Sequence, residues 1–134
     1  MLPQTAKVLV VDDMSTMRKL IKKSLSELGY TNVVEAVDGE DAFTKITDAL
    51  KTNAPVAMVL SDWNMPKMKG IDLLIKVRGT NGTKALPFIL LTAESEKDQV
   101  AVAVKAGVSE YLLKPFTKDQ LAEKMKAATS RKAA

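Results

Sequence analysis

A chain of 134 residues with 46% apolar and 27% charged side chains suits a single folded domain with one core. It contains no cysteine and no histidine, which excludes disulfides, cysteine-ligated zinc, and histidine as a general base or phosphoryl carrier. The net charge of +4 is compatible with a nucleic-acid partner. However, no aromatic residues interleave with the densest basic group, which consists of Arg18, Lys19, Lys22 and Lys23. We interpret this group as a solvated helix face and expect no nucleic-acid partner.

Predicted strands and helices alternate along the chain. In chain order, the strand–helix pairs are Val8–Val11 with Ser15–Leu28, Val33–Ala36 with Glu40–Lys51, Val56–Leu60 with Ile71–Arg78, Phe88–Leu91 with Glu96–Ala106, and Tyr111–Leu113 with Lys118–Ala128. The strands are nearly continuous in apolar residues, which is typical of a parallel sheet covered on both faces. The pattern therefore predicts an α/β fold, a three-layer, doubly wound (βα)5 parallel sheet with right-handed crossovers.

Several helix boundaries carry sequence signals. Gly29 follows the first predicted helix, and capping patterns precede the last two helices, in Ser95 with Asp98 and in Thr117 with Gln120. The first helix is expected to place one apolar face on the core, made of Met14, Met17, Leu20, Ile21, Leu25 and Leu28. Apolar runs stay far below the ~20 residues needed to cross a bilayer, and the N-terminus lacks a signal pattern. We therefore expect a cytoplasmic protein without membrane insertion.

Polar side chains follow four of the five predicted strands. They are Asp12 and Asp13 after the first strand, Asp62 after the third, Thr92 after the fourth and Lys114 after the fifth. Ligands of open parallel sheets bind outside the carboxyl ends of the strands, so these side chains should meet at one rim. Each alone has a simpler interpretation, as a helix cap, a strand-end hydroxyl or a surface cation. Their convergence on one rim favours a functional site.

The residue types at this rim indicate a particular chemistry. Three carboxylates in one cleft repel one another unless a cation neutralises them. Because the ligands are all hard oxygens, magnesium is the expected cofactor, with manganese able to replace it. A carboxylate can attack phosphorus to give an acyl phosphate, while the metal and a lysine neutralise the phosphoryl oxygens and a threonine hydroxyl hydrogen-bonds one of them. The rim therefore predicts phosphoryl transfer onto an aspartate.

Five strings resemble the receiver domain of bacterial two-component response regulators. They are Val8-Leu9-Val10-Val11-Asp12-Asp13, Ser15-Thr16-Met17-Arg18, Ser61-Asp62-Trp63-Asn64-Met65-Pro66, Thr92-Ala93-Glu94, and Tyr111 with Lys114-Pro115-Phe116. The second and third strings are similar to those of the chemotaxis members of the family. The resemblance covers nearly the whole chain and implies one receiver domain over residues 1–134, without an output domain. It also implies a flavodoxin-like sheet with strand order 2-1-3-4-5.

The resemblance implies a role for each residue of the rim. Asp62 would be the phosphoacceptor, and Lys114 would contact the phosphoryl group. Magnesium would be bound directly by Asp13, by Asp62 and by the backbone carbonyl of Asn64, and through ordered water by Asp12. These roles follow from matching positions in the family pattern and extend the chemistry that the residue types predict.

The resemblance further implies a switch. Thr92 would move toward the acyl phosphate, Tyr111 would rotate inward behind it, and Asn64 and Glu94 would influence the rate of hydrolysis. The response would reach the face built by the fourth helix, the fifth strand and the fifth helix. Candidate partner-surface residues on this face are Lys97, Val100, Val104, Val108, Tyr111 and Lys124. For the three valines, ordinary packing is an equal alternative to an interface role.

These inferences together describe a monomeric phosphoacceptor signalling protein, not an enzyme. The expected partners are a chemotaxis histidine kinase and the flagellar motor switch protein, with a phosphatase as a further candidate. The alternative is a single-domain receiver that serves as a phosphorelay intermediate or regulates a non-motor partner. A phosphatase of the haloacid dehalogenase type would need a second aspartate two residues after its nucleophile, where this chain has Asn64.

Two features depart from the family pattern. Lys69 stands where the family commonly has aspartate, which accepts hydrogen bonds from backbone N–H groups at the start of the third helix. Lysine cannot accept such bonds, and Asp72 is expected to compensate in the first turn. The stretch Asp48–Pro55 is longer than in familiar chemotaxis regulators, so we expect an extended end to the second helix followed by a surface loop.

Overall fold

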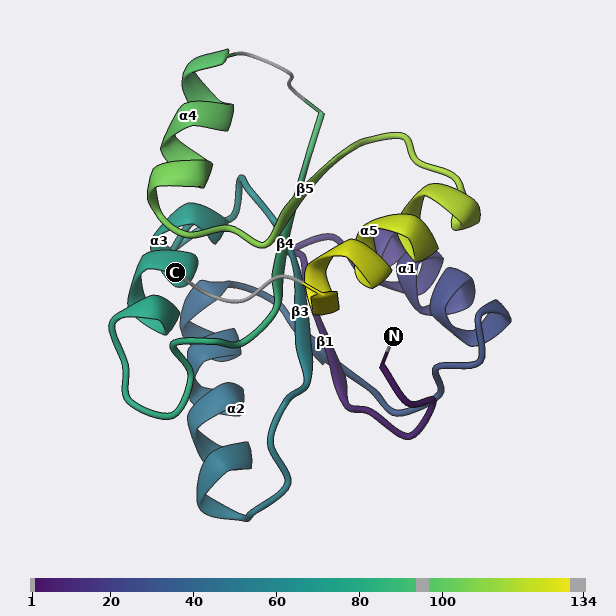
Figure 1. Cartoon of the computed structure of the whole chain (residues 1–134), viewed down its shortest axis with the longest axis horizontal. Helices are drawn as coiled ribbons and strands as arrows, with labels where there is room; N and C mark the ends of the chain where they lie inside the picture. Colours follow the sequence, from purple (N-terminus) through teal and green to yellow (C-terminus); the bar gives the residue numbers. More distant parts are fainter. Residues whose placement is uncertain (1, 94–96, 131–134) are drawn as a thin grey trace.

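The computed structural model describes residues 2–93 and 97–130, and at residues 97 and 98 only the course of the backbone. Within these ranges five strands alternate with five helices (Figure 1). In chain order they are β1 (Val8–Val11), α1 (Ser15–Glu27), β2 (Val33–Ala36), α2 (Gly39–Lys51), β3 (Met58–Asp62), α3 (Gly70–Arg78), β4 (Phe88–Thr92), α4 (Lys97–Lys105), β5 (Glu110–Leu113) and α5 (Lys118–Ser130).

The strands form one parallel sheet in the order β2-β1-β3-β4-β5. Both the predicted α/β fold and the strand order that the resemblance implies are confirmed. After β1 the chain turns outward to β2 and then returns to place β3 on the other side of β1. The direction of winding therefore reverses between β1 and β3, and this reversal point is where open α/β sheets bind ligands.

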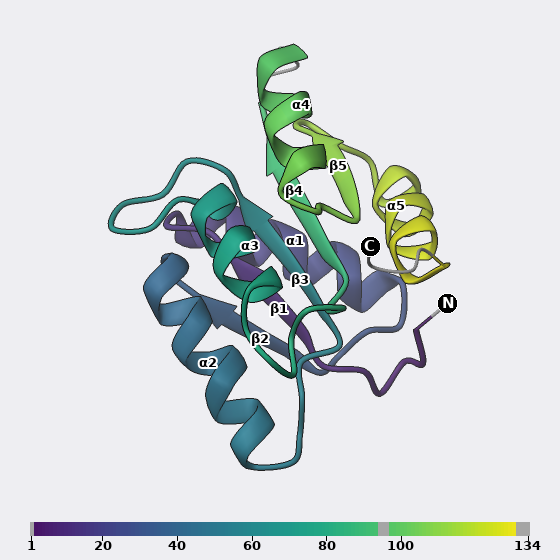
Figure 2. The same ribbon diagram turned by 60° about the vertical axis from the view of Figure 1, so that its left-hand side comes forward.

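Helices cover both faces of the sheet and enclose two apolar cores. Helices α1 and α5 lie on one face, and α2, α3 and α4 lie on the other (Figures 1 and 2). Along β1, Val8 and Val10 pack toward α1 and α5, whereas Leu9 and Val11 pack toward the opposite helices. Successive residues of a strand point to opposite faces, and helices cover both faces here. All four side chains are therefore fully buried. This two-sided burial explains the nearly continuous apolar character of the strands.

Two strands end later than the sequence predicts. β3 includes Asp62 and β4 includes Thr92, so each is the last residue of its strand, where we expected it to follow the strand. The reason is continued parallel pairing, of Asp62 with Leu91 and of Thr92 with Leu113. The consequence matters for the site, because the sheet ladder fixes the backbone of both residues.

The predicted apolar face of α1 is partly wrong. Ile21 and Leu25 are fully buried as expected, but Met14 is 59% exposed and Leu20 is 55% exposed. Met14 precedes the helix with an extended backbone (φ −97°, ψ 117°), so it does not share the helical periodicity. Leu20 directly precedes Ile21, and the rotation of about 100° between neighbouring helical residues turns it away from the core.

Most predicted helix boundaries agree with the structure. Gly29 ends α1 with a φ of +96°, a conformation that glycine adopts without steric cost. At the start of α5, the Thr117 N–H donates to Oε1 of Gln120 at 2.9 Å, and the Gln120 N–H donates to Oγ1 of Thr117 at 3.1 Å. This reciprocal pair is the expected capping box. The capping pattern at Ser95 lies outside the described residues.

The structure locates both departures from the family pattern. Lys69 precedes α3 and makes no side-chain capping hydrogen bond, while Asp72 lies in the first turn of α3. Helix α2 runs to Lys51 and is followed by an exposed segment over residues 52–55. Among the described helices, none combines the length and the apolar character that crossing a membrane requires.

Candidate functional site

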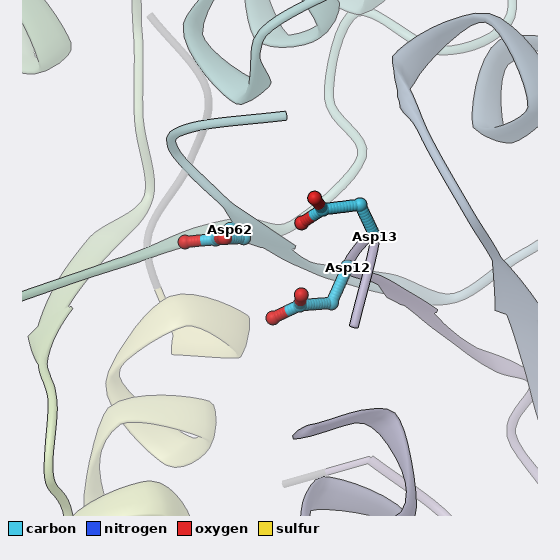
Figure 3. Close-up of side chains that lie close together, drawn as sticks. All are labelled: Asp12, Asp13 and Asp62. Carbon is cyan, nitrogen blue, oxygen red and sulfur yellow. The ribbon is translucent and has the colours of Figure 1, made fainter. Parts of the chain in front are cut away.

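Three carboxylates converge at the carboxyl end of the sheet, where the winding direction reverses. Strands β1 and β3 are paired with Val11 opposite Ser61, so the residues that follow Val11 lie beside Asp62. One carboxylate oxygen from each of Asp12, Asp13 and Asp62 lies within 4.8 Å of the other two. Figure 3 shows these side chains directed to the same side of the rim. Asp12 is buried, Asp62 is half-buried and Asp13 is exposed, so the cluster opens to solvent beside Asp13.

Lys114 connects two of these carboxylates. Its ammonium group donates to Oδ1 of Asp62 at 3.0 Å and lies 3.5 Å from Oδ2 of Asp12. The backbone N–H of Lys114 donates to the carbonyl of Thr92 at 2.7 Å, and the bond from Lys114 to Pro115 is cis. The side chain is only 16% exposed. Lys114 is therefore held in the cleft, and its simpler interpretation as a surface cation is wrong.

Asp12 combines a structural role with its place in the cluster. Its Oδ1 accepts a hydrogen bond from the Met14 N–H at 2.9 Å, which stabilises the turn into α1. Burial raises the pKa of Asp12, while the Met14 hydrogen bond opposes this change. The charge of Asp62 raises the pKa further, and Lys114 lowers it. The carboxyl group of Asp12 is therefore less acidic than an ordinary aspartate.

Asp62 presents one oxygen to the protein and one to the cleft. Its Oδ1 accepts hydrogen bonds from its neighbour, the Trp63 N–H at 2.9 Å, and from Lys114. Within residues 2–93 and 97–130, no donor contacts Oδ2. The side chain is 15% exposed, so a group that enters the cleft can reach this oxygen. Fixed orientation and access are what a nucleophilic carboxylate needs.

The donor set fits a divalent cation. Three carboxylates carry three negative charges, and Lys114 supplies one positive charge against them. All of the clustered ligand atoms are hard carboxylate oxygens, which suit magnesium or manganese better than softer metals. A divalent ion would neutralise the remaining charge. The cluster can therefore hold a metal ion of this class.

Aromatic side chains connect the site to the edge strand β5. Trp63 directly follows Asp62 and is buried, and its ring meets that of Tyr111 edge to face at a centroid distance of 6.4 Å. Tyr111 is half-buried on β5, and Thr92 is buried at the end of β4. Sequence reasoning named Thr92 and Tyr111 but missed the contact between the rings. This contact joins the backbone beside Asp62 to β5.

The other predicted residues lie in different surroundings. Asn64 is exposed in the loop between β3 and α3, two residues beyond Asp62. Glu94 lies outside the described residues. Of the predicted partner surface, Val100 and Val104 are exposed, and Val108 and Tyr111 are half-buried against the core. The ammonium group of Lys124 forms an ion pair with Glu110 at 3.3 Å. Lys97 belongs to α4, but its side chain is not among those described.

Three residues near the site were missed by sequence reasoning. Arg18 was assigned to a solvated helix face, but it is 13% exposed and donates to the carbonyl of Asp12 at 2.7 Å. Gly70 packs so tightly against β3 that a Cβ there would overlap the carbonyl oxygen of Asp62. Asp38, beyond β2, is buried and accepts a hydrogen bond from the Asp41 N–H as the cap of α2. Of these three residues, only Asp38 could have been found from the sequence, because an aspartate three residues before another acidic residue is a helix-capping pattern.

Comparison with known proteins assigns the chain to one family. Residues 8–126 match the response regulator receiver domain. The chain therefore belongs to the response regulator receiver family, as the resemblance predicted. Receiver domains of this type are signalling proteins, and the acidic cluster lies in the part of the chain that the family match covers.

Several of the similar proteins are chemotaxis proteins. Over 119 residues the chain is 50% identical to the chemotaxis protein CheY1 of Helicobacter pylori strain J99, which covers 89% of this chain and 93% of that protein. It is 45% identical to the chemotaxis protein CheY homolog of Campylobacter jejuni over 119 residues, or 89% and 88% of the two chains. The crystallised CheY4 of Vibrio cholerae superimposes with a TM-score of 0.81 at 31% identity, covering 92% and 98%. The chain is thus a receiver homologous to the CheY regulators.

Proposed function

We propose that this protein is a chemotaxis response regulator that accepts a phosphoryl group from a histidine kinase onto Asp62. One observation carries the proposal: Asp12, Asp13 and Lys114 all converge on Asp62 at the reversal point of the sheet. A capping or surface role for each residue would not require this convergence. The named relatives, which are chemotaxis proteins, support the choice of pathway.

The contacts of Asp62 indicate how it would react. Its Oδ1 is held by Trp63 and Lys114, which leaves Oδ2 to attack the phosphorus of a phosphohistidine. A P–O bond forms as the P–N bond breaks, and the electron pair leaves with the imidazole nitrogen of the donor. Lys114 then moves its hydrogen bond to a phosphoryl oxygen and balances part of the added charge. The product is an acyl phosphate on Asp62.

Magnesium, or manganese in its place, is the cofactor that the cluster fits. Asp13, Asp62 and the backbone carbonyl of Asn64 would hold the ion directly, and Asp12 would hold it through water. Bound there, the ion would neutralise charge on the phosphoryl oxygens during transfer. The exposed position of Asp13 leaves the cleft open to the ion and to the donor. Asn64 follows Asp62 by two residues, and Glu94 follows Thr92 by two residues. We propose that these two residues set the rate at which the acyl phosphate is hydrolysed.

Phosphorylation would act as a switch. It replaces the single negative charge of the Asp62 carboxylate with a phosphoryl group that carries about −1.5 to −2, and it places new acceptor oxygens at the end of β3. The buried Thr92 would donate its hydroxyl hydrogen to one of these oxygens, and Tyr111 would move inward behind it. The contact of Tyr111 with Trp63 supports this route, because Trp63 adjoins the acceptor. The change would reach the α4–β5–α5 face, whose candidates are Lys97, Val100, Val104, Val108, Tyr111 and Lys124.

The partners follow from this scheme. A histidine kinase would supply the phosphoryl group, the flagellar motor switch protein would bind the phosphorylated α4–β5–α5 face, and a phosphatase would end the signal. The protein would act as a monomer in the cytoplasm. An alternative with the same chemistry is a phosphorelay, in which Asp62 passes its phosphoryl group to a histidine phosphotransfer protein.

Labelling with radioactive acetyl phosphate tests the acceptor. We expect Asp62→Asn to lose all label and Asp48→Asn, which changes an exposed aspartate of α2, to keep it. A chelator should abolish labelling of the wild type. Label that persists on Asp62→Asn would show that the acceptor is elsewhere. Pull-down of the phosphorylated protein with the motor switch protein and with a histidine phosphotransfer protein would then separate the two alternatives.

A further inference from the structure

Asp13 is exposed, and its side chain receives no hydrogen bond from the described part of the chain, yet its carboxylate lies in the cluster. Its position must therefore come from the backbone on either side. The Met14 N–H belongs to the peptide plane after Asp13 and is held by Oδ1 of Asp12 at 2.9 Å. The carbonyl of Asp12 belongs to the peptide plane before Asp13 and accepts a hydrogen bond from Nη1 of Arg18 at 2.7 Å. Because peptide units are planar, these two bonds together fix the backbone at Asp13 and with it the direction of its Cα–Cβ bond.

Arg18 is itself held in place. Its Nε donates to Oε1 of Glu35 at 3.0 Å, and its side chain is 13% exposed. Glu35 lies on β2 opposite Val10 and also pairs with Lys22 at 3.2 Å. The hydrogen bond from Arg18, supported by Lys22, holds the pKa of Glu35 below its usual range, so the anchor stays ionised. Arg18 therefore transmits the fixed position of β2 to the turn after β1.

We propose that Arg18, braced by Glu35, is a positioning residue that sets the Asp12–Asp13 peptide so that the Asp13 carboxylate faces the metal. This inference rests on the proposed metal site and adds to it a residue that touches neither metal nor phosphoryl group. The direction in which Mg²⁺ affinity changes when Arg18 is replaced distinguishes a positioning role from an effect of its charge. Loss of the Arg18 charge alone would make the cleft more attractive to a cation, whereas loss of positioning weakens binding.

Lys22 provides a matched control. Arg18→Gln and Lys22→Gln each remove one positive charge and one bond to Glu35, but only Arg18 contacts the carbonyl of Asp12. Calorimetric titration with Mg²⁺ should show a dissociation constant raised about tenfold in Arg18→Gln, at the low end of the range for residues that orient metal ligands. In Lys22→Gln it should stay within about twofold of the wild type. Equal constants in the two variants would overturn the proposal.

A second measurement needs no metal. The amide nitrogen of Asp13 belongs to the peptide plane that Arg18 holds, so its NMR order parameter reports the brace directly. We expect a value near ~0.85 in the wild type and in Lys22→Gln, and a fall toward ~0.6 in Arg18→Gln. Arg18→Lys, which keeps the charge but lacks the planar fork, should also lower the value and is the variant to use if Arg18→Gln unfolds. An unchanged order parameter in the folded variant would overturn the proposal.

The underlying metal site has its own control. If the wild type binds no Mg²⁺, or if Asp13→Asn binds it as the wild type does, the proposed metal site is wrong. If Asp13→Asn loses binding while both Arg18 variants bind normally, the metal site stands and only the role of Arg18 fails.

Discussion

Gly70 is the position at which the start of α3 packs most closely against the proposed phosphoacceptor. A Cβ at this position would lie 3.0 Å from the carbonyl carbon of Asp62 and 3.0 Å from Oγ of Ser61, and it would overlap the carbonyl oxygen of Asp62. The Gly70 N–H also donates to the carbonyl of Trp63 at 2.9 Å. The helix therefore cannot retreat to accommodate a methyl group without breaking this hydrogen bond.

The expected cost of Gly70→Ala follows from what the methyl group meets. Overpacking a well-packed region costs about 1–3 kcal/mol, and the obstructing atoms here are largely backbone, which cannot rotate away. Alanine recovers at most about 1 kcal/mol through its helix propensity. Because the obstruction is backbone, we take the upper end of the overpacking cost, and after the recovery we expect the free energy of unfolding to fall by about 2 kcal/mol. Because the displaced group is the carbonyl of Asp62, we also expect weaker Mg²⁺ binding.

Gly79 at the other end of α3 is the matched control. Its φ is −90°, and a Cβ there would lie no closer than 3.4 Å to the carbonyl oxygen of Ile75. Equilibrium unfolding in urea should place Gly79→Ala within about 0.5 kcal/mol of the wild type. If Gly70→Ala is as stable as Gly79→Ala and binds Mg²⁺ normally, the close approach of α3 to β3 does not constrain the site.

Three further predictions address the metal, the charge cluster and the partner surface. Mg²⁺ should quench the fluorescence of Trp63, which adjoins Asp62, and Asp13→Ala should remove the quench; the same response in both proteins would contradict the site. Burial raises the pKa of Asp12 above its ordinary value of 3.8, so the folded metal-free protein holds this proton more tightly than the unfolded chain does. The contribution of Asp12 to stability therefore falls as the pH rises from 3.8 through the raised pKa. Asp12→Asn should therefore be the more stable protein in urea at neutral pH, and a gain that persists below 3.8 would point to another cause. Val104 is 66% exposed, so Val104→Asp should change the unfolding free energy by less than about 0.5 kcal/mol yet weaken binding of the phosphorylated protein to the motor switch; normal binding would remove Val104 from that surface.

The sequence predicted the fold and the rim because both depend on position along the strands. Burial on both faces leaves a continuous apolar run that is readable without coordinates, as in Val8–Val11. Parallel strands bring their carboxyl ends to one edge, so Asp12 and Asp62 could be placed together before their oxygens were located. β3 ends two residues later than predicted, at Asp62, and β4 one residue later, at Thr92, because polar residues can continue a ladder when the neighbouring strand supplies the partners.

Contacts made by side chains across the fold could not be predicted in this way. Arg18 lies among basic residues on an amphipathic helix, and its turn toward Asp12 depends on Glu35, which is 17 residues away in the chain. The simpler pattern of helical periodicity also failed for Leu20, which lines an apolar pocket with Met17 and Phe116 instead of joining the core. In each case the outcome depends on which neighbouring element offers a partner, and composition and spacing do not carry that information.

Asp12 both stabilises the structure around β1 and belongs to the proposed metal site. Its backbone N–H donates to the carbonyl of Ala36 on β2, its Oδ1 holds the turn into α1, and its Oδ2 faces Lys114. The buried carboxylate costs stability because its charge is poorly solvated and lies beside two further carboxylates. The two apolar cores offset this cost, and a bound cation would remove it. Asparagine at position 12 keeps the acceptor for Met14 while removing the charge, so it should gain stability and lose metal affinity together. The exposed Asp13 has no comparable contact with the residues that the structure describes, and Asp13→Asn should lose metal affinity with little change in stability.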